Sequence, residues 1–121
     1  GFVAASPSIW WSSRAVLAGE PGFSDAVTAA KVTPRVLLTV GGDEQRLPDL
    51  PPALADKRAA IAESIDSARM IDNCTELAAR LKALRGAPGY EVTGCLTFPG
   101  QAHGISAWPA IGQAIEFTIK P

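Results

Sequence analysis

The sequence has few of the residues that mark metalloproteins, nucleic-acid-binding proteins and membrane proteins. It contains one histidine and two cysteines, and the spacing of Cys74 and Cys95 fits neither a zinc site nor a dithiol redox motif. No run of lysine and arginine marks a basic face and the formal net charge is -1, so neither nucleic acid nor an anionic membrane is an expected partner. No apolar run approaches the length of a membrane-spanning helix.

What is present describes a globular chain with a substantial core. Hydrophobic residues make up 47% of the sequence and charged residues 19%, a balance that distinguishes it from disordered chains. The 121 residues suffice for one domain or for part of a larger one. The chain starts without methionine, in an apolar run typical of the inside of a strand, so we expect part of the fold to lie upstream. The cysteines fit two buried free thiols, or a disulfide in an oxidising compartment, and both a cytoplasmic and a periplasmic location stay open.

Three segments have the character of strands. Residues 2–6 are apolar and end in Ser-Pro, which is typical of a buried strand. Residues 35–40 form a continuous apolar run, the pattern of a strand buried on both faces of a parallel sheet. Residues 90–98 alternate between apolar and more polar side chains, which suits an edge or near-edge strand.

Helical segments separate these strands. Ser12 or Ser13 is a suitable cap for a short helix to Leu17, and the closing helix places Trp108, Ile111 and Ile115 on one stripe. We expect helices over residues 12–17, 24–31, 53–65 and 66–85, and from Ser106 onwards. The order predicts a single α/β domain over residues 1–121, with a small, mainly parallel, three-stranded sheet flanked by helices.

The only histidine, His103, follows the third strand, while Asp43 and Glu44 follow the second. The carboxyl ends of parallel strands lie at the same edge of a sheet, so these groups should meet there. A histidine oriented by a carboxylate can serve as a general base, and either acid is a candidate partner because turn geometry decides which one faces the ring. The simpler interpretation is a polar surface loop beside a solvated turn. A metal site built from these groups lacks a further ligand at a sensible spacing.

Three blocks of sequence resemble those of a known family. They are Ala5-Ser6-Pro7-Ser8-Ile9-Trp10-Trp11, Leu37-Leu38-Thr39-Val40-Gly41 running into Glu44-Gln45, and Phe98 through His103-Gly104. In this order they resemble an esterase family of the α/β-hydrolases that includes the siderophore trilactone esterases and other carboxylic ester hydrolases. The likeness covers nearly all of the chain, and it implies a partial α/β-hydrolase fold, the carboxyl-terminal half of a serine esterase.

The resemblance also implies roles for single residues. His103 matches the catalytic histidine, and Glu44 matches the acid, with Asp43 as the competing choice. Ser8, Trp10 and Trp11 are expected to form part of the substrate pocket wall, where an indole offers an apolar face and one donor. The expected ligand of the complete enzyme is a small-molecule ester, and no cofactor is implied.

The chain departs from the family in one respect, because it contains no Gly-x-Ser-x-Gly elbow. The nucleophile would lie before Gly1, so we expect the chain alone to be inactive. Ser6 and Ser8 are candidate substitutes at the same sheet edge, but Pro7 between them disfavours the strand-turn-helix elbow. The alternative hypothesis is a non-catalytic α/β fragment that associates through an open sheet edge, with a second copy or with the missing amino-terminal half.

Overall fold

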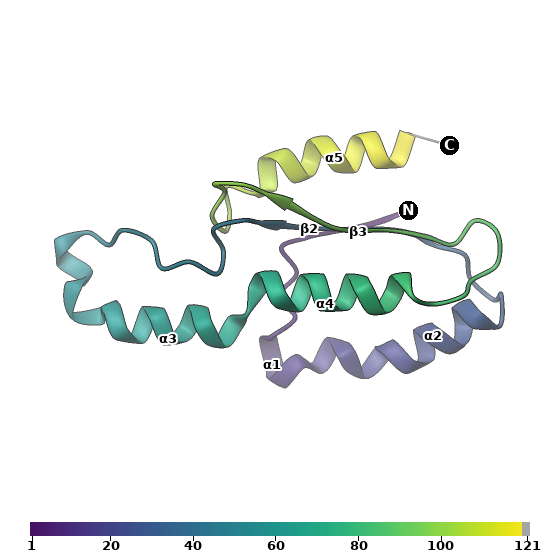
Figure 1. The fold of residues 1–121 in the computed structure, drawn as a ribbon, viewed down its shortest axis with the longest axis horizontal. Coiled ribbons are helices and arrows are strands. Elements are labelled where there is room, and N and C mark those ends of the chain that lie inside the picture. Colours follow the sequence, from purple (N-terminus) through teal and green to yellow (C-terminus); the bar gives the residue numbers. More distant parts are fainter. Residues whose placement is uncertain (120–121) are drawn as a thin grey trace.

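The computed structural model describes residues 1–119, which form three layers around a parallel sheet (Figure 1). The strands are β1 (Phe2–Ala5), β2 (Arg35–Gly41) and β3 (Glu91–Phe98), in the spatial order β1-β2-β3. Both pairings are parallel. The predicted α/β class, the three strands and the edge position of the third strand are therefore confirmed.

Helices cover both faces of this sheet. In chain order the helical elements are α1 (Trp11–Arg14), the 3-10 helix η1 (Ala15–Gly19), α2 (Glu20–Thr28), the 3-10 helix η2 (Pro52–Lys57), α3 (Arg58–Ala68), α4 (Met70–Lys82) and α5 (Ala107–Ile119). In Figure 1, α5 lies on one face, whereas α4, with α1 and α2 beyond it, lies on the other. Within residues 1–119, no helix has the length and apolar character needed to cross a membrane.

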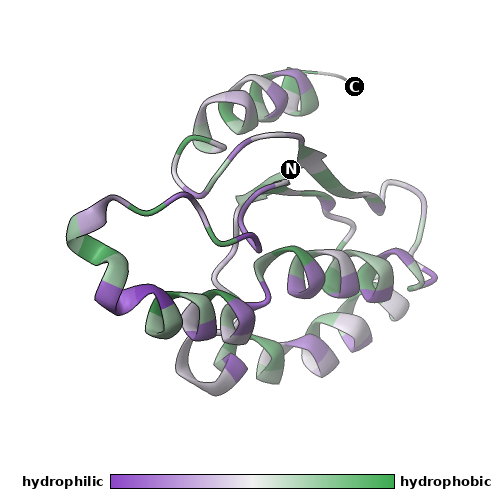
Figure 2. Ribbon diagram, turned by 60° about the vertical axis from the view of Figure 1, so that its left-hand side comes forward, coloured by the Kyte–Doolittle hydropathy of each residue, from purple (hydrophilic) through white to green (hydrophobic). Residues whose placement is uncertain are grey.

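The core lies between α4 and the sheet, and the strands there are largely green, that is hydrophobic, in Figure 2. Its buried members are Leu38, Val40, Met70, Cys74, Ala78, Leu81 and Val92. Those on α4 recur every three or four residues, so they share the face that meets the strands. β2 is buried from Leu37 to Gly41 because it has a neighbour on each side and helices on both faces. Cys74 and Cys95 are free thiols, as the first of the two interpretations expected, but only Cys74 is buried and Cys95 is half-buried.

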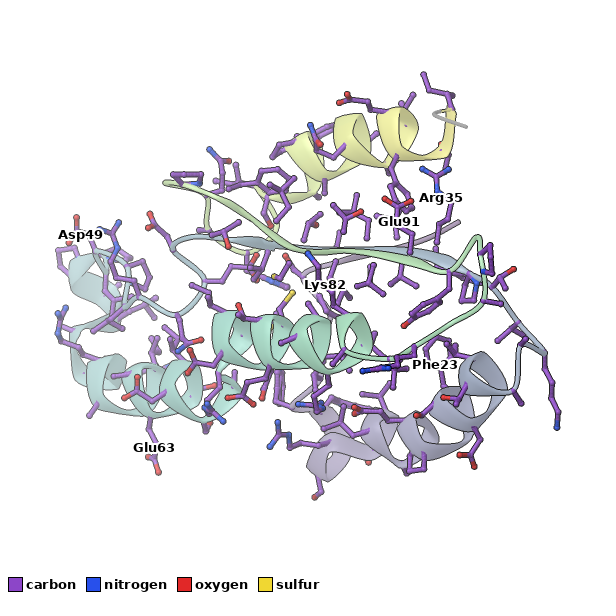
Figure 3. The ribbon with its side chains drawn as sticks, turned by 45° about the vertical axis from the view of Figure 1, so that its right-hand side comes forward. Phe23, Arg35, Asp49, Glu63, Lys82 and Glu91 are labelled. Carbon is purple, nitrogen blue, oxygen red and sulfur yellow. The ribbon has the colours of Figure 1, made fainter. Side chains whose placement is uncertain are left out.

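Arg35 and Glu91 lie opposite each other in the register of β2 and β3, and Figure 3 shows them between the sheet and α5. Arg35 Nε donates to Glu91 Oε2 at 3.0 Å, and the Arg35 guanidinium lies 4.7 Å from the ring centroid of Phe117 on α5. A cation over an aromatic face is attracted by the ring quadrupole. These contacts attach the last helix to the end of the sheet remote from His103.

The prediction of a strand at residues 2–6 is confirmed, but its predicted burial is wrong, because Phe2 and Ala5 are exposed and Val3 and Ala4 are only half-buried. Phe2 is 68% exposed, because β1 pairs with β2 on one side and with no described strand on the other. The apolar stripe of the closing helix also faces outward, with Trp108, Ile111 and Ile115 exposed by 75%, 53% and 57%. Instead α5 buries Ala110 and Phe117. Two apolar surfaces of the chain thus lack cover within residues 1–119.

The predicted short helix from Ser12 or Ser13 to Leu17 is wrong in its geometry. Ser12, Ser13 and Arg14 have left-handed φ values of 50°, 55° and 65°, and a 3-10 helix follows. Arg14 is held by α4, where its Nη2 donates to Asn73 Oδ1 at 2.8 Å and lies 3.7 Å from Glu76 Oε2. This tertiary contact has no trace in local sequence periodicity.

Two helix boundaries also differ from the prediction. α2 begins at Glu20 rather than Ser24, because Pro21 is well tolerated in a first turn and Glu20 accepts two hydrogen bonds from Arg80, at 2.7 and 3.0 Å. The break predicted after Ile65 falls instead at Arg69, which has a φ of 45°. Arg69 forms ion pairs with carboxylates of α4, at 3.3 Å with Asp72 and 2.7 Å with Glu76.

Candidate active site

Hydrogen bonds between backbone groups connect the loop that follows β2 to the loop that follows β3. Gly42 N donates to Phe98 O at 2.8 Å, and Asp43 N donates to Gln101 O at 3.0 Å. The approach is so close that a Cβ on Gly41 would lie 2.3 Å from Gln101 O and 2.8 Å from Glu44 Oε1. Only glycine fits at position 41, so this residue permits the two loops to meet.

This junction brings Glu44 and His103 together. His103 Nδ1 lies 2.8 Å from Glu44 Oε2, and the Glu44 side chain is 0% exposed whereas that of His103 is 64% exposed. An ionised carboxylate can only accept hydrogen bonds, so Nδ1 carries the proton and a neutral ring has its lone pair on Nε2. The pair can therefore accept a proton at Nε2 and stabilise the resulting imidazolium.

Asp43, the neighbouring carboxylate, has a different partner. Its Oδ2 accepts a hydrogen bond from Arg46 Nη2 at 2.9 Å, in an exposed pair three residues apart. The structure therefore brings one of the two candidate acids to the imidazole, and that acid is Glu44.

The second oxygen of Glu44 is surrounded by donors. Oε1 accepts hydrogen bonds from Ser6 Oγ at 2.5 Å, Gly41 N at 2.7 Å and Ser106 Oγ at 2.9 Å. Burial raises the pKa of the Glu44 carboxyl, but hydrogen bonds from Ser6, His103, Gly41 and Ser106 lower it, and the net pKa lies below its ordinary value of 4.5. The carboxylate is therefore ionised at neutral pH although it is buried.

Sequence reasoning considered Ser6 as a substitute nucleophile and Ser106 as a helix cap. In the structure both hydroxyls donate to the carboxylate of Glu44. Within residues 1–119, no serine hydroxyl donates to Nε2 of His103. The two serines belong to the acid side of the site, and only the spatial convergence of β1, β2 and α5 shows it.

Gln45 has a structural role that the sequence did not reveal. Its Oε1 accepts from Ile71 N at 2.8 Å and from Asp72 N at 3.0 Å, and its Nε2 donates to Asp72 Oδ2 at 2.9 Å. These backbone N–H groups lie in the first turn of α4, where no intrahelical acceptor is available. Gln45 thus connects the loop that carries Glu44 to the start of α4.

Two hollows border His103. One, of about 390 Å³, lies between the loop after β2 and α3 and includes Arg46 and Ile65, while a smaller one of about 160 Å³ includes Ser8 and Trp10. Ile65 borders both, so α3 supplies a wall that sequence reasoning missed. Trp11 borders neither and is 67% exposed. No group of three or more His, Cys, Asp or Glu suited to a metal ion occurs among the residues that the structure describes.

This chain is similar in sequence and in structure to known proteins. The siderophore enterobactin esterase of Emericella nidulans is 33% identical over 120 residues, which are 96% of this chain and 38% of that protein. The siderophore hydrolase EstA from Aspergillus nidulans superposes with a TM-score of 0.74 and 28% identity, over 96% of this chain and 38% of that one. Its counterpart EstB gives a TM-score of 0.71 at 24% identity, over 94% and 37%. No family model matches the chain.

The chain spans less than two fifths of the length of these relatives, namely 38%, 38% and 37%. Nearly all of this chain is nevertheless covered, both in the sequence alignment and in the structural superpositions. The chain therefore has part of an α/β-hydrolase fold, and its relatives are siderophore esterases and hydrolases, as the three sequence blocks implied.

Proposed function

We propose that this chain is the carboxyl-terminal part of a carboxylic ester hydrolase, a serine esterase in which His103 is the general base and Glu44 the triad acid. The observation that carries the proposal is the 2.8 Å contact between His103 Nδ1 and Glu44 Oε2. It lies beyond the carboxyl ends of adjacent parallel strands, where α/β folds collect their catalytic groups. The names of the relatives support ester hydrolysis as the reaction class.

In this mechanism a serine from protein outside these 121 residues attacks the ester carbonyl carbon. Nε2 of His103 takes the serine proton as the C–O bond forms, and the negative charge of Glu44 stabilises the imidazolium. When the tetrahedral intermediate collapses, Nε2 returns the proton to the leaving alcohol. Water then attacks the acyl-enzyme, and His103 acts as base a second time.

We assign the acid to Glu44 rather than Asp43. The hydrogen bonds that Glu44 accepts from protein groups keep it ionised and leave Oε2 for the imidazole. Asp43 is occupied by Arg46, at 2.9 Å. A carboxylate paired with a guanidinium on the surface is poorly placed to stabilise an imidazolium.

For the substrate we propose a siderophore-type ester, the class named for the relatives. Ser8 and Trp10 border the smaller hollow beside His103, which supports their role in the pocket wall. The role of Trp11 in the wall of the complete pocket stays a prediction. Arg46 borders the larger hollow but is paired with Asp43, so Asp43 offsets its charge toward a ligand.

A second candidate is a non-catalytic α/β unit that associates through β1 with a second copy or with an amino-terminal half. Phe2 is 68% exposed on an edge strand, and Trp108 is 75% exposed on α5. Apolar surfaces of this kind favour association. Under this proposal the Glu44–His103 contact is a structural remnant.

The test is the mass of the intact protein from its source, set beside esterase activity on a short-chain chromogenic ester. We expect a mass well above 12.6 kDa and activity that falls about 10⁶-fold in His103→Ala, a loss typical of removing a triad base. Ile105→Ala is the matched control, because Ile105 lies on the same loop and is 59% exposed. Full activity in His103→Ala would refute the esterase proposal. A mass of 12.6 kDa without activity would favour the second candidate.

A further inference from the structure

We propose that Ser6 and Ser106 are positioning residues of the triad acid. Their hydroxyls hold Oε1 of Glu44, so that Oε2 faces Nδ1 of His103. The inference rests on the proposed function, in which Glu44 orients the imidazole. It extends that function to two serines outside the triad.

The three donors to Oε1 come from three different elements. Ser6 directly follows β1, Gly41 ends β2, and Ser106 directly precedes α5. Their distances to Oε1 are 2.5, 2.7 and 2.9 Å, while Oε2 has the His103 ring at 2.8 Å. The two carboxylate oxygens therefore have distinct partners, and rotating the carboxylate would break hydrogen bonds on both.

The two serine hydroxyls donate to a carboxylate that is buried away from solvent. Ser106 as a whole residue is 2% exposed and the Glu44 side chain is fully buried, so water has little access to replace a lost donor. A buried carboxylate that loses donors becomes easier to protonate, and a protonated carboxyl no longer stabilises an imidazolium. The serines thus serve both the orientation of the acid and its charge.

A backbone hydrogen bond to β2 fixes the position of Ser6. Its N–H donates to Thr39 O at 2.8 Å, and it has a left-handed φ of 45°, which is uncommon for a residue other than glycine. In this conformation its hydroxyl donates to Glu44 and lies 3.1 Å from that of Ser106. The contact argues against Ser6 as the nucleophile, because its hydroxyl donates to the acid and not to the base.

A purely structural role, in which Ser106 supports the start of α5, is the competing explanation. Threonine and valine at position 106 separate the two, because they have the same shape and differ only in the hydroxyl. In the complete protein that contains this chain, we expect Ser106→Val to lower kcat by roughly 10- to 100-fold with KM unchanged, the range for hydrogen bonds to a charged group. Ser106→Thr should restore most of that loss. Ser6→Ala should lower kcat to a similar degree.

The second measurement is the NMR signal of the proton on Nδ1 of His103, assigned by its disappearance in His103→Ala. We expect the signal to weaken or shift in Ser106→Val and in Ser6→Ala, and to persist in Ser106→Thr. This readout needs no turnover, so it tests the positioning even in a protein without esterase activity. Absent wild-type activity with these shifts would refute only the proposed function. An unchanged signal and kcat in Ser6→Ala and Ser106→Val, or equal losses in the threonine and valine variants, would overturn the inference.

Discussion

The sheet has two edge strands, β1 and β3, and their outer sides differ in composition and geometry. β3 exposes Glu91, Thr93 and Thr97, and it contains an extra residue between Val92 and Cys95 relative to β2. Gly94, within that irregularity, has a φ of 117°. Polar side chains and bulges are the usual means of protecting a sheet edge from further pairing.

β1 has neither protection. It consists of Phe2–Ala5, an apolar segment without a polar or charged side chain, and Phe2 is 68% exposed. Within residues 1–119, β1 is thus the edge strand that lacks protection against further pairing. At their carboxyl ends the two strands also contribute differently, since β3 leads to the imidazole while β1 leads to a serine that donates to the acid. Under the proposed function, we therefore expect the serine nucleophile to approach from the side of β1.

Among the changes that test this comparison of the two edges, the largest expected effect is at Glu44, which accepts hydrogen bonds from the residues that follow both edge strands. In the complete protein, Glu44→Gln should lower kcat by about 10⁴-fold, the order seen when a triad acid is removed. Asp43→Asn is the matched control, because it makes the same chemical change one residue away, and we expect less than about a threefold change since exposed ion pairs contribute little. Steady-state kinetics of both variants measure this difference. Comparable losses in the two would show that the acid assignment is wrong.

A smaller effect should separate the two edges. Phe2→Asp and Leu96→Asp each place a charge on one edge strand, at residues that are 68% and 37% exposed. In the 121-residue chain alone, Leu96→Asp should be the more destabilising variant because Leu96 is more buried. In the complete protein the order should reverse, with Phe2→Asp costing about 2 kcal/mol, because a covered β1 edge would bury this ring.

Urea unfolding of both variants in both contexts measures the order. If Phe2→Asp stays the milder variant in the complete protein, β1 is not the covered edge.

The smallest expected effect is a pH dependence of stability. The pKa of Glu44 is lowered on folding, so its contribution to stability is fully present above the unfolded value of about 4.5 and is lost as the pH falls through the folded value. The free energy of unfolding should therefore decline below about pH 4.5, where the unfolded chain binds the proton more readily. Urea titrations between pH 7 and 3 test this. Glu44→Gln, which has no proton to bind, should show a smaller decline, and an identical decline would contradict the assignment.

Much of the fold was predictable because apolar runs of four to eight residues are typical of strands. β2 was recognisable as the central strand from its unbroken apolar run, and β3 as an edge strand from its alternation. The start of α2 was not, because an ion pair with a residue distant in sequence favours it, at 2.7 Å between Glu20 and Arg80. The break at Arg69 was not either, because it depends on a single left-handed residue, whose φ is 45°. Local periodicity carries no information about either feature.

By itself the sequence determined that His103 and a carboxylate pair follow two parallel strands. The carboxyl ends of parallel strands necessarily lie at the same end of the sheet. Only the tertiary structure decided that Glu44 rather than Asp43 faces the ring, because the turn after Gly41 directs adjacent side chains to opposite environments. It also decided the roles of Ser6 and Ser106, which lie 100 positions apart in the chain and 3.1 Å apart in space. Contacts of that separation arise from the packing of β1, β2 and α5, which no local stretch of sequence encodes.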